Sequence, residues 1–281
     1  MKEAMQRART LRPLAFALAA VMALTSLAGC AQRPLPTFAW QGQAAATAVL
    51  ARRAAEVRTV RAECSVYLAK PDGSTLGLEG ALAAAPPDRM RLRTWKLGQA
   101  ALDVTIRPGE IWIETPEGKA PDVKPDTASL PRAESKAGPW AAKFAEGWRL
   151  MAGGFFEKPA DRVEDSSGAT YMLFRRLDDA EVVCEVDRRT LVPLAYRVLD
   201  ERGVTRFTLR LDGYAVYGDE AKSVQENSGS ANTEARTIVW PARIVAITDS
   251  GRITIRLRDP EFNTDLPASV FEPPGGAVRQ P

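Results

Sequence analysis

The sequence contains no histidine among its 281 residues. Histidine supplies the base of Ser-His-Asp and Cys-His catalytic sites and is a common zinc ligand, so these arrangements are excluded. The Gly-x-Ser-x-Gly and Gly-x-x-x-x-Gly-Lys-Ser/Thr signatures are also missing. Paired carboxylates such as Asp178-Asp179 are compatible with glycoside cleavage, but they precede a predicted strand at 181–186, where charged turn residues are ordinary. We therefore expect no enzymatic activity, no metal site and no cofactor.

A large excess of one charge is also missing. The formal net charge is +3, and residues 1–29 carry four Lys or Arg residues and one Glu, so the remainder is balanced. This balance gives no reason to expect a nucleic-acid partner. Long apolar runs are scarce as well, because the stretch from Leu14 to Leu24 is shorter than the ~20 residues that a spanning helix needs. A basic leader followed by a short apolar stretch and small residues is typical of a signal peptide.

The sequence Leu27-Ala28-Gly29-Cys30 resembles the lipobox of bacterial lipoproteins. The resemblance implies that residues 1–29 are removed and that Cys30 carries a diacylglycerol and an N-linked acyl chain, typically palmitate. Two or more acyl chains give stable membrane anchoring. Ala31 in place of Asp implies sorting to the outer membrane, with the protein on the periplasmic face. The alternatives are an uncleaved signal anchor or a chance cysteine after a secretory signal.

Two further cysteines, Cys64 and Cys184, form an even pair in what would be an oxidising compartment. Both fall in predicted strands, and a disulfide requires that the two strands bring them together. A disulfide and two buried free thiols therefore remain alternatives.

Beyond the leader, residues 30–42 contain two prolines and no helical periodicity, so they are expected to form a lipidated tether. Residues 43–57 favour a helix, with Arg53 on its wet side. Most later segments alternate apolar and polar residues, which predicts antiparallel strands with one buried face. The clearest are residues 89–95, 101–107, 205–213 and 251–259. We expect one domain over residues 43–281.

Two stretches interrupt the alternation. Residues 119–137 and 219–236 are polar and poor in large apolar residues, as solvated loops are. The first leads into a predicted helix whose Trp140, Phe144, Trp148 and Met151 share one face. This aromatic stripe is either a lid over a ligand cavity or the ordinary packing of a helix on a sheet.

The order of these elements resembles the lipoprotein-localisation family, the periplasmic carrier and its outer-membrane receptor. The similar segments are a helix, a strand with an Asp-Gly turn, Gly80-Ala81-Leu82, Pro86-Pro87, residues 89–95, residues 106–116 and residues 270–278. The resemblance implies a mainly β (α+β) fold, an incomplete and strongly curved antiparallel barrel whose apolar concave face is covered by helices. It also implies a cavity for acyl chains. The chain departs from the family at Ala85, where the carrier has a basic residue that holds the lid.

On this resemblance, Trp112, Trp140, Phe144, Trp148 and Met151 are the candidate cavity residues. Arg89, Arg91 and Arg93 alternate on one strand and would either bind phosphate head groups or form a solvated outer surface. The expected function is binding of an apolar ligand, the acyl part of a lipid or lipoprotein, in lipoprotein or lipid sorting. The alternative is an envelope-stress sensor or interaction module of the same fold, whose partner is another envelope protein.

Overall fold

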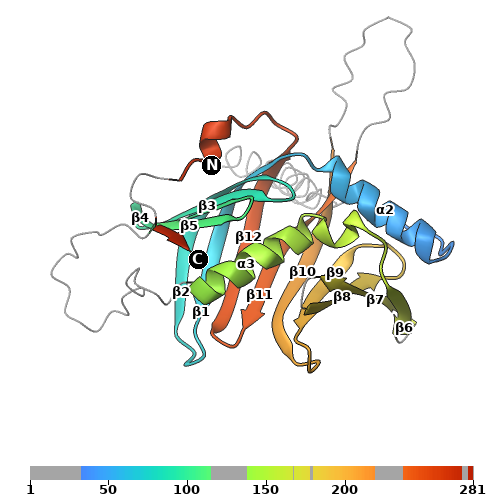
Figure 1. The fold of residues 1–281 in the computed structure, drawn as a ribbon. Helices are drawn as coiled ribbons and strands as arrows, with labels where there is room; N and C mark the ends of the chain where they lie inside the picture. Colours follow the sequence, from blue (N-terminus) through green and yellow to red (C-terminus); the bar gives the residue numbers. More distant parts are fainter. Residues whose placement is uncertain are drawn as a thin grey trace, which may run out of the picture. The chain divides into compact units, whose positions relative to one another are not determined.

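The computed structural model describes residues 33–114, 138–166, 168–177, 180–218, 237–273 and 278–280, and only the backbone of 138–142, 278 and 280. Within the compact unit Leu35–Pro281, the described residues form one antiparallel sheet of thirteen strands. The sheet is curved and open, and helices lie across one of its faces (Figure 1). This is the fold class that the sequence predicts.

Most strands follow one another along the chain with short connections. The first group is β1 (Val60–Ala69), β2 (Thr75–Ala85), β3 (Arg89–Lys96), β4 (Gln99–Arg107) and β5 (Glu110–Glu114). The second group is β6 (Arg162–Ser166), β7 (Thr170–Leu177), β8 (Ala180–Asp187), β9 (Pro193–Leu199), β10 (Thr205–Tyr217), β11 (Ile238–Thr248) and β12 (Gly251–Phe262), and the short β13 (Val278–Gln280) ends the series.

Most neighbours in the sheet are consecutive in sequence. The spatial order is β13-β5-β4-β3-β2-β1-β12-β11-β10-β9-β8-β7-β6, so the exceptions are the pairs β1–β12 and β5–β13. In the β1–β12 ladder, Val66 lies opposite Ile255, and in the β1–β2 ladder it lies opposite Leu78. The first strand and the last long strand therefore meet in the interior of the sheet.

Alternation along each strand separates the two faces of the sheet. In β1, Val60, Ala62 and Val66 are buried, whereas Arg61 and Glu63 are exposed. Directly opposite residues of antiparallel strands share a face, so the apolar side chains continue from strand to strand. One such buried row consists of Leu78, Val66, Ile255, Ile244 and Leu211.

Two α-helices in the described part of the chain cover the apolar face, α2 (Gln43–Glu56) and α3 (Gly138–Met151) (Figure 1). The short helix η1 (Gly154–Glu157) follows α3 directly. The opposite face is covered in part by η2 (Ala268–Phe271), because Arg91 Nη1 donates to the Val270 carbonyl at 3.0 Å and Arg107 Nε to the Phe271 carbonyl at 2.7 Å.

The observed elements confirm the predicted strands at 89–95, 101–107, 205–213 and 251–259, which are β3, β4, β10 and β12, each slightly longer than expected. The helix predicted at 43–57 is α2. The loops expected at 119–137 and 219–236 lie outside the described residues, as does Cys30.

Candidate functional site

The inner face of α3 packs directly on the sheet. Phe144, Trp148 and Met151 are all buried, with between 5% and 8% of their surface exposed. A cavity of about 20 Å³ lies beneath them. Its walls are apolar and come from α3 and five strands: Leu82, Met90, Phe144, Gly147, Trp148, Met151, Phe207, Leu209, Ile244, Ala246 and Ile255. We name this space the α3 cavity.

Gly147 brings α3 unusually close to β10. A methyl group placed on Gly147 would lie 2.6 Å from Cζ of Phe207, which is closer than carbon atoms approach in folded proteins. The absence of a side chain therefore allows this contact. The Trp148 indole Nε1 is buried and has no hydrogen-bond partner among the described residues.

The structure does not bring all the candidate cavity residues together. Trp112 lies opposite Thr105, which lies opposite Arg91, so it belongs to the face that carries the arginines. Its indole Nε1 donates to Glu110 Oε2 at 3.3 Å. Trp112 therefore does not line the α3 cavity, contrary to expectation, and its neighbour Ile113 faces the core instead. The side chain of Trp140 lies outside the described residues.

The two ends of α3 are held differently. Near its start, Lys143 Nζ lies 2.8 Å from Asp249 Oδ1 in the turn between β11 and β12, and Asp249 is exposed. After its end, the buried Arg175 of β7 donates through Nη1 to the carbonyls of Gly154 and Phe155. Gly153, between α3 and η1, has a positive φ of 103°. This end is therefore fixed to the sheet by a buried cation.

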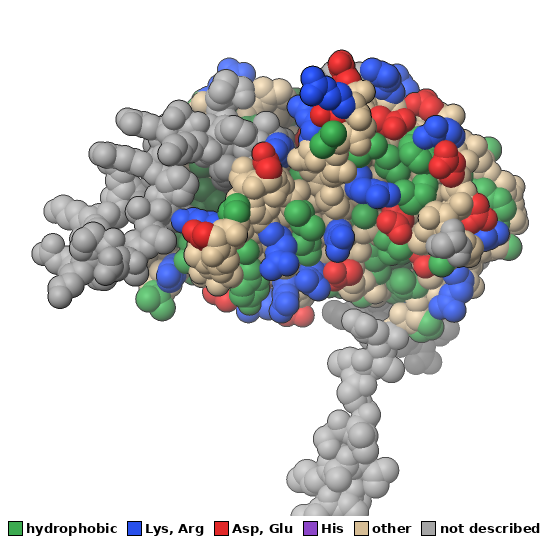
Figure 2. Space-filling model, turned by 90° about the horizontal axis from the view of Figure 1, so that it is seen from below, with side chains coloured by type: hydrophobic (Ala, Val, Ile, Leu, Met, Phe, Trp, Pro, Cys, Tyr) green, Lys and Arg blue, Asp and Glu red, His purple; other side chains and the backbone are tan. Residues whose placement is uncertain are grey.

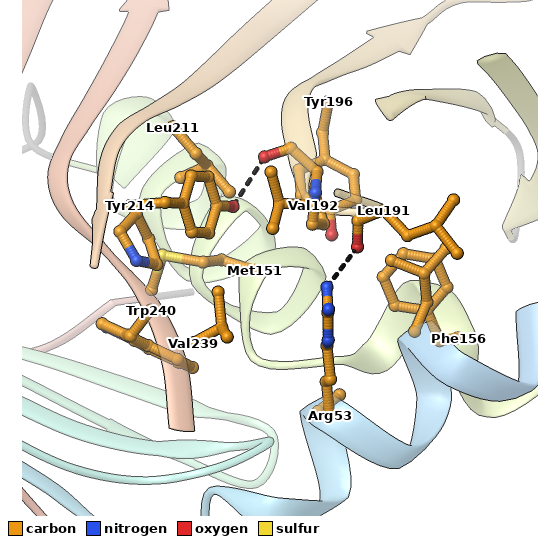
Figure 3. A pocket seen from close by; sticks show the side chains of 14 residues that line it. Arg53, Met151, Phe156, Leu191, Val192, Tyr196, Leu211, Tyr214, Val239 and Trp240 are labelled. Atoms are coloured by element: carbon orange, nitrogen blue, oxygen red, sulfur yellow. Dashed lines mark hydrogen bonds between the residues drawn. The ribbon is translucent and has the colours of Figure 1, made fainter. Parts of the chain in front are cut away.

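A second cavity, of about 50 Å³, lies between α2 and the sheet (Figure 3). We name it the α2 cavity. Most of its lining is apolar, but four lining side chains carry polar atoms: Arg53, Tyr196, Tyr214 and Trp240. Met151 lines both cavities, so its flexible thioether side chain is the boundary between them.

Arg53 extends from α2 toward β9, as Figure 3 shows. Its Nη1 donates to the carbonyls of Thr190 at 2.8 Å and Leu191 at 2.7 Å, and its guanidinium carbon lies 4.5 Å from the centre of the Phe38 ring. Its Nη2 is buried without a partner among the described residues. Burial lowers the pKa of Arg53 from its usual value, and the Glu56 carboxylate opposes that change. The guanidinium remains charged.

Two other buried polar atoms belong to the lining of the α2 cavity. The Trp240 indole Nε1 has no hydrogen-bond partner among the described residues, and the Tyr196 hydroxyl has only the thiol of Cys184, its neighbour on β8 and a weak acceptor. Burial raises the pKa of Tyr196 well above its ordinary value, so the hydroxyl keeps its proton. The Tyr214 hydroxyl is satisfied, because it donates to the Pro193 carbonyl at 2.6 Å. The lining of the α2 cavity therefore carries two unpaired donors, Arg53 Nη2 and Trp240 Nε1, and one hydroxyl with a weak acceptor.

The expectation that Arg53 lies on the wet side of its helix is wrong. Leu50 and Val57 are buried, and Arg53 lies three residues after one and four before the other, on the same helical face. That spacing is the signal that would have identified it. No comparable local pattern marks Tyr196 or Trp240.

The expected tether is partly attached to the domain. Residues 33–42 lack regular structure, but the Phe38 amide donates to the Arg189 carbonyl at 2.8 Å, and the Trp40 ring stacks on Tyr171 with centroids 3.9 Å apart. The chain thus enters α2 from a fixed direction.

Cys64 and Cys184 are both buried free thiols. They lie in β1 and β8, which are separated in the sheet by β12, β11, β10 and β9. The disulfide alternative is therefore wrong for this structure. Burial raises the pKa of Cys64 to about 12, so its thiol is protonated at neutral pH.

The arginines of β3 pair with a carboxylate. Arg91 Nη2 lies 2.8 Å and Arg93 Nε 3.2 Å from Asp103 Oδ2, and Arg89 is exposed. Asp103 and the contact of Arg91 with η2 occupy the groups of Arg91 and Arg93 that would bind a phosphate. The outer face is solvated at Arg89 and Arg93, whereas Arg91 is covered by η2. Figure 2 shows basic and acidic side chains interspersed on the face that it displays.

The described residues offer little for other chemistry. No group of three or more His, Cys, Asp or Glu residues among them could hold a metal ion. Asp178 and Asp179 lie outside the described residues. No helix in the described part of the chain is long and apolar enough to cross a membrane. Together the two cavities can enclose an apolar group and bind a group that accepts hydrogen bonds.

No protein-family model and no curated protein matches this chain. Solved structures that resemble it include a LolA superfamily protein from Nitrosomonas europaea, at 12% identity over 80% of this chain and 97% of that one, with a TM-score of 0.45. A DUF1329 family protein from Desulfovibrio piger aligns at 12% identity over 82% and 97%, with a TM-score of 0.49. An outer membrane lipoprotein-sorting protein domain from Vibrio parahaemolyticus aligns at 13% over 82% and 97%, with a TM-score of 0.48. At these values the similarities assign no function, and the site is interpreted from its own geometry.

Proposed function

We propose that this protein is a lipid-anchored, non-enzymatic binding protein that encloses the acyl part of a lipid or lipoprotein between α3 and the sheet. The observation that supports this most is the apolar α3 cavity beneath Phe144, Trp148 and Met151. A cover with an apolar inner face over an apolar sheet suits a hydrocarbon chain, because burial of apolar surface drives the association.

Binding requires α3 to move. The α3 cavity of about 20 Å³ is far smaller than ligand pockets, which span roughly 300–1,000 Å³. Gly153 lies between α3 and η1, Gly154 is the first residue of η1, and the positive φ of Gly153 marks a sharp change of direction there. We propose that α3 pivots at these glycines, with its far end released from Asp249.

Anchoring through Cys30 is the second part of the proposal. It places the domain at the periplasmic face of the outer membrane, with residues 31–37 joining the lipid to the fixed Phe38. Cys30→Ser should leave the precursor unprocessed, because the diacylglyceryl thioether cannot form. Wild-type protein from cells should have the mass of residues 30–281 plus acyl groups. An intact leader, or a mature mass without acyl groups, would contradict the anchor.

The binding proposal is tested by titrating the full chain, held in amphipol to avoid competing detergent, with hexadecanol. Tryptophan emission should change saturably, since Trp148 lines the space that the chain enters. Trp148→Ala should weaken that response while circular dichroism shows a folded domain. The absence of a saturable response to hexadecanol, palmitate and lysolipid would rule the function out.

A protein-interaction or sensor module of the same fold is the second candidate. The observation that favours it is the close contact at Gly147, which is what ordinary helix packing would show. In that case Trp148→Ala would lower the free energy of unfolding by the ~3–5 kcal/mol expected of a fully buried aromatic residue, and the domain would unfold. An envelope protein would also copurify with the chain.

A further inference from the structure

The α2 cavity differs from the α3 cavity in the chemistry of its lining. Two buried donors of its lining, Arg53 Nη2 and Trp240 Nε1, have no partner among the described residues, and Tyr196 Oη has only the weakly accepting Cys184 thiol. An unpaired buried donor is disfavoured by about 1–3 kcal/mol, and more when it is charged. The three residues that carry these donors line one space of about 50 Å³, which indicates a site for a ligand that accepts hydrogen bonds.

The groups that could satisfy these donors from within the protein are already engaged. The carbonyls of Thr190 and Leu191 accept from Arg53 Nη1, and the carbonyl of Pro193 accepts from Tyr214. No carboxylate among the described residues forms an ion pair with Arg53, and the nearby Glu56 pairs with Arg52 at 3.9 Å. The cavity thus offers donors and a positive charge, and lacks a matching anion.

These properties select a carboxylate over a water molecule. A water accepts two hydrogen bonds and must place two of its own, whereas a carboxylate accepts about four and donates none. Charge-assisted bonds from a guanidinium are also stronger than neutral ones. The volume suits a small head group, since it exceeds the ~10–15 Å³ that one water occupies but is far below that of a whole lipid.

The boundary between the cavities indicates where the rest of the ligand lies. Met151 lines both, and beyond it the α3 cavity is wholly apolar. A ligand with its head at Arg53 would therefore extend past Met151 beneath α3. We propose that the ligand is a long-chain fatty acid, with its carboxylate held by Arg53, Tyr196 and Trp240 and its hydrocarbon tail under α3.

This assignment rests on the proposed function, because the hydrocarbon tail occupies the space between α3 and the sheet in which the proposed function places the acyl chain. The test compares palmitate with hexadecanol, which have the same tail and different heads, on the full chain in amphipol. Wild type should bind palmitate roughly tenfold more tightly than hexadecanol, the gain expected of one charge-assisted hydrogen bond.

Two variants locate the preference. Arg53→Gln should abolish the preference for palmitate, and Tyr196→Phe should reduce it several-fold, because each variant weakens palmitate binding more than hexadecanol binding. Tyr171→Phe is the matched control, because the Tyr171 hydroxyl is also buried, has no partner among the described residues and does not line the α2 cavity. It should change neither affinity. Tyr196→Phe also protects the test against misfolding, since it removes only one hydroxyl, whose partner is the weakly accepting Cys184 thiol.

The outcomes separate the two proposals. Equal binding of palmitate and hexadecanol by the wild type, or a preference that survives Arg53→Gln and Tyr196→Phe, would overturn the carboxylate pocket and leave acyl binding intact. Failure of both ligands to bind would overturn the proposed function itself. Acetate that displaces palmitate at equal concentration would show that the pocket takes a small carboxylate alone, and would overturn the fatty acid assignment.

Discussion

Helices α2 and α3 both lie on the apolar face of the sheet, but different contacts hold them there. α2 is fixed by directional hydrogen bonds along its length: Gln43 Nε2 donates to the Ala160 carbonyl at 3.1 Å, Arg53 Nη1 donates to the carbonyls of Thr190 and Leu191, and Asn263 Nδ2 donates to the Glu56 carbonyl at 3.0 Å. α3 instead faces the sheet with Gly147, Trp148 and Met151, which pack on apolar side chains of the strands.

The difference between the hydrogen bonds of α2 and the apolar packing of α3 determines which helix can move. A hydrogen bond weakens steeply when its geometry changes, whereas apolar burial is non-directional and tolerates sliding of one surface on another. α2 is therefore the fixed wall, and it carries the polar pocket. α3 is the cover that a ligand can displace. The following predictions test this division, in order of decreasing expected effect.

Phe144→Asp should have the largest effect. It places an unpaired charge between α3 and the sheet, which costs several kcal/mol of the free energy of unfolding. Urea unfolding measures this. Arg149→Asp, an exposed change on the same helix, is the control and should cost less than about 1 kcal/mol. A similar small loss in both variants would mean that Phe144 is not held against the sheet.

Gly147→Ala should weaken the packing of α3 on the sheet. The new methyl group would meet Phe207 at 2.6 Å, and overpacking of ~1–3 kcal/mol exceeds the ~1 kcal/mol gained in helix propensity. Hydrogen exchange in α3 should accelerate, and so should the association of hexadecanol. Phe207→Leu in the same chain should reverse both effects by making room. A Gly147→Ala variant more stable than wild type would show that Phe207 can move aside to make room for the methyl group.

Asn263→Ala should loosen α2 without helping a ligand to enter. Asn263 Oδ1 also accepts from the Arg58 amide at 2.7 Å, so two hydrogen bonds at the end of α2 are lost, at about 1–2 kcal/mol. Asn263→Gly is the control for its positive φ of 56°, which alanine tolerates poorly. Exchange in α2 should rise in both variants. Faster association of hexadecanol in either would contradict the fixed role of α2.

Breaking the contact between Lys143 and Asp249 should have the smallest effect on stability, because surface ion pairs contribute little. The hydrogen bond from Lys143 lowers the pKa of Asp249. The contact is therefore complete above the ordinary pKa of an aspartate, ~3.9, and is lost as the pH falls through the lowered value. Hexadecanol association should accelerate over that range in wild type. In Asp249→Asn the association of hexadecanol should be fast at every pH. A rate equal to that of wild type at neutral pH would mean that the contact between Lys143 and Asp249 does not hold α3 on the sheet.

The strands were predictable because one-sided burial leaves a period of two in the sequence. β3 and β12 show this alternation through Met90, Leu92 and Thr94, and through Ile255 and Leu257. The stripe of Phe144, Trp148 and Met151 likewise identified the buried face of α3, since all three are buried against the sheet.

Features that depend on long-range geometry were not predictable. Trp112 lies between Ile111 and Ile113, so both faces of β5 are apolar and only the Pro108-Gly109 turn decides which is buried. The separation of Cys64 from Cys184 depends on strand order, which no local pattern encodes. The orientation of Arg53, by contrast, was predictable from its spacing to Leu50 and Val57, because a guanidinium with two carbonyl acceptors can face the core.

The pairing of β1 with β12 has a consequence for biogenesis. β1 begins at Val60 and its partner ends at Phe262, so the central ladder of the sheet joins segments about two hundred residues apart. Until β12 is available, the β1–β5 hairpins and the later strands are two separate half-sheets, each with an unpaired edge that invites association with other chains. Such non-local closure is slow. A chain secreted from its N-terminus would thus expose the edge of β1 for most of its transit, and we expect its folding to depend on protection of that edge until the last long strand arrives.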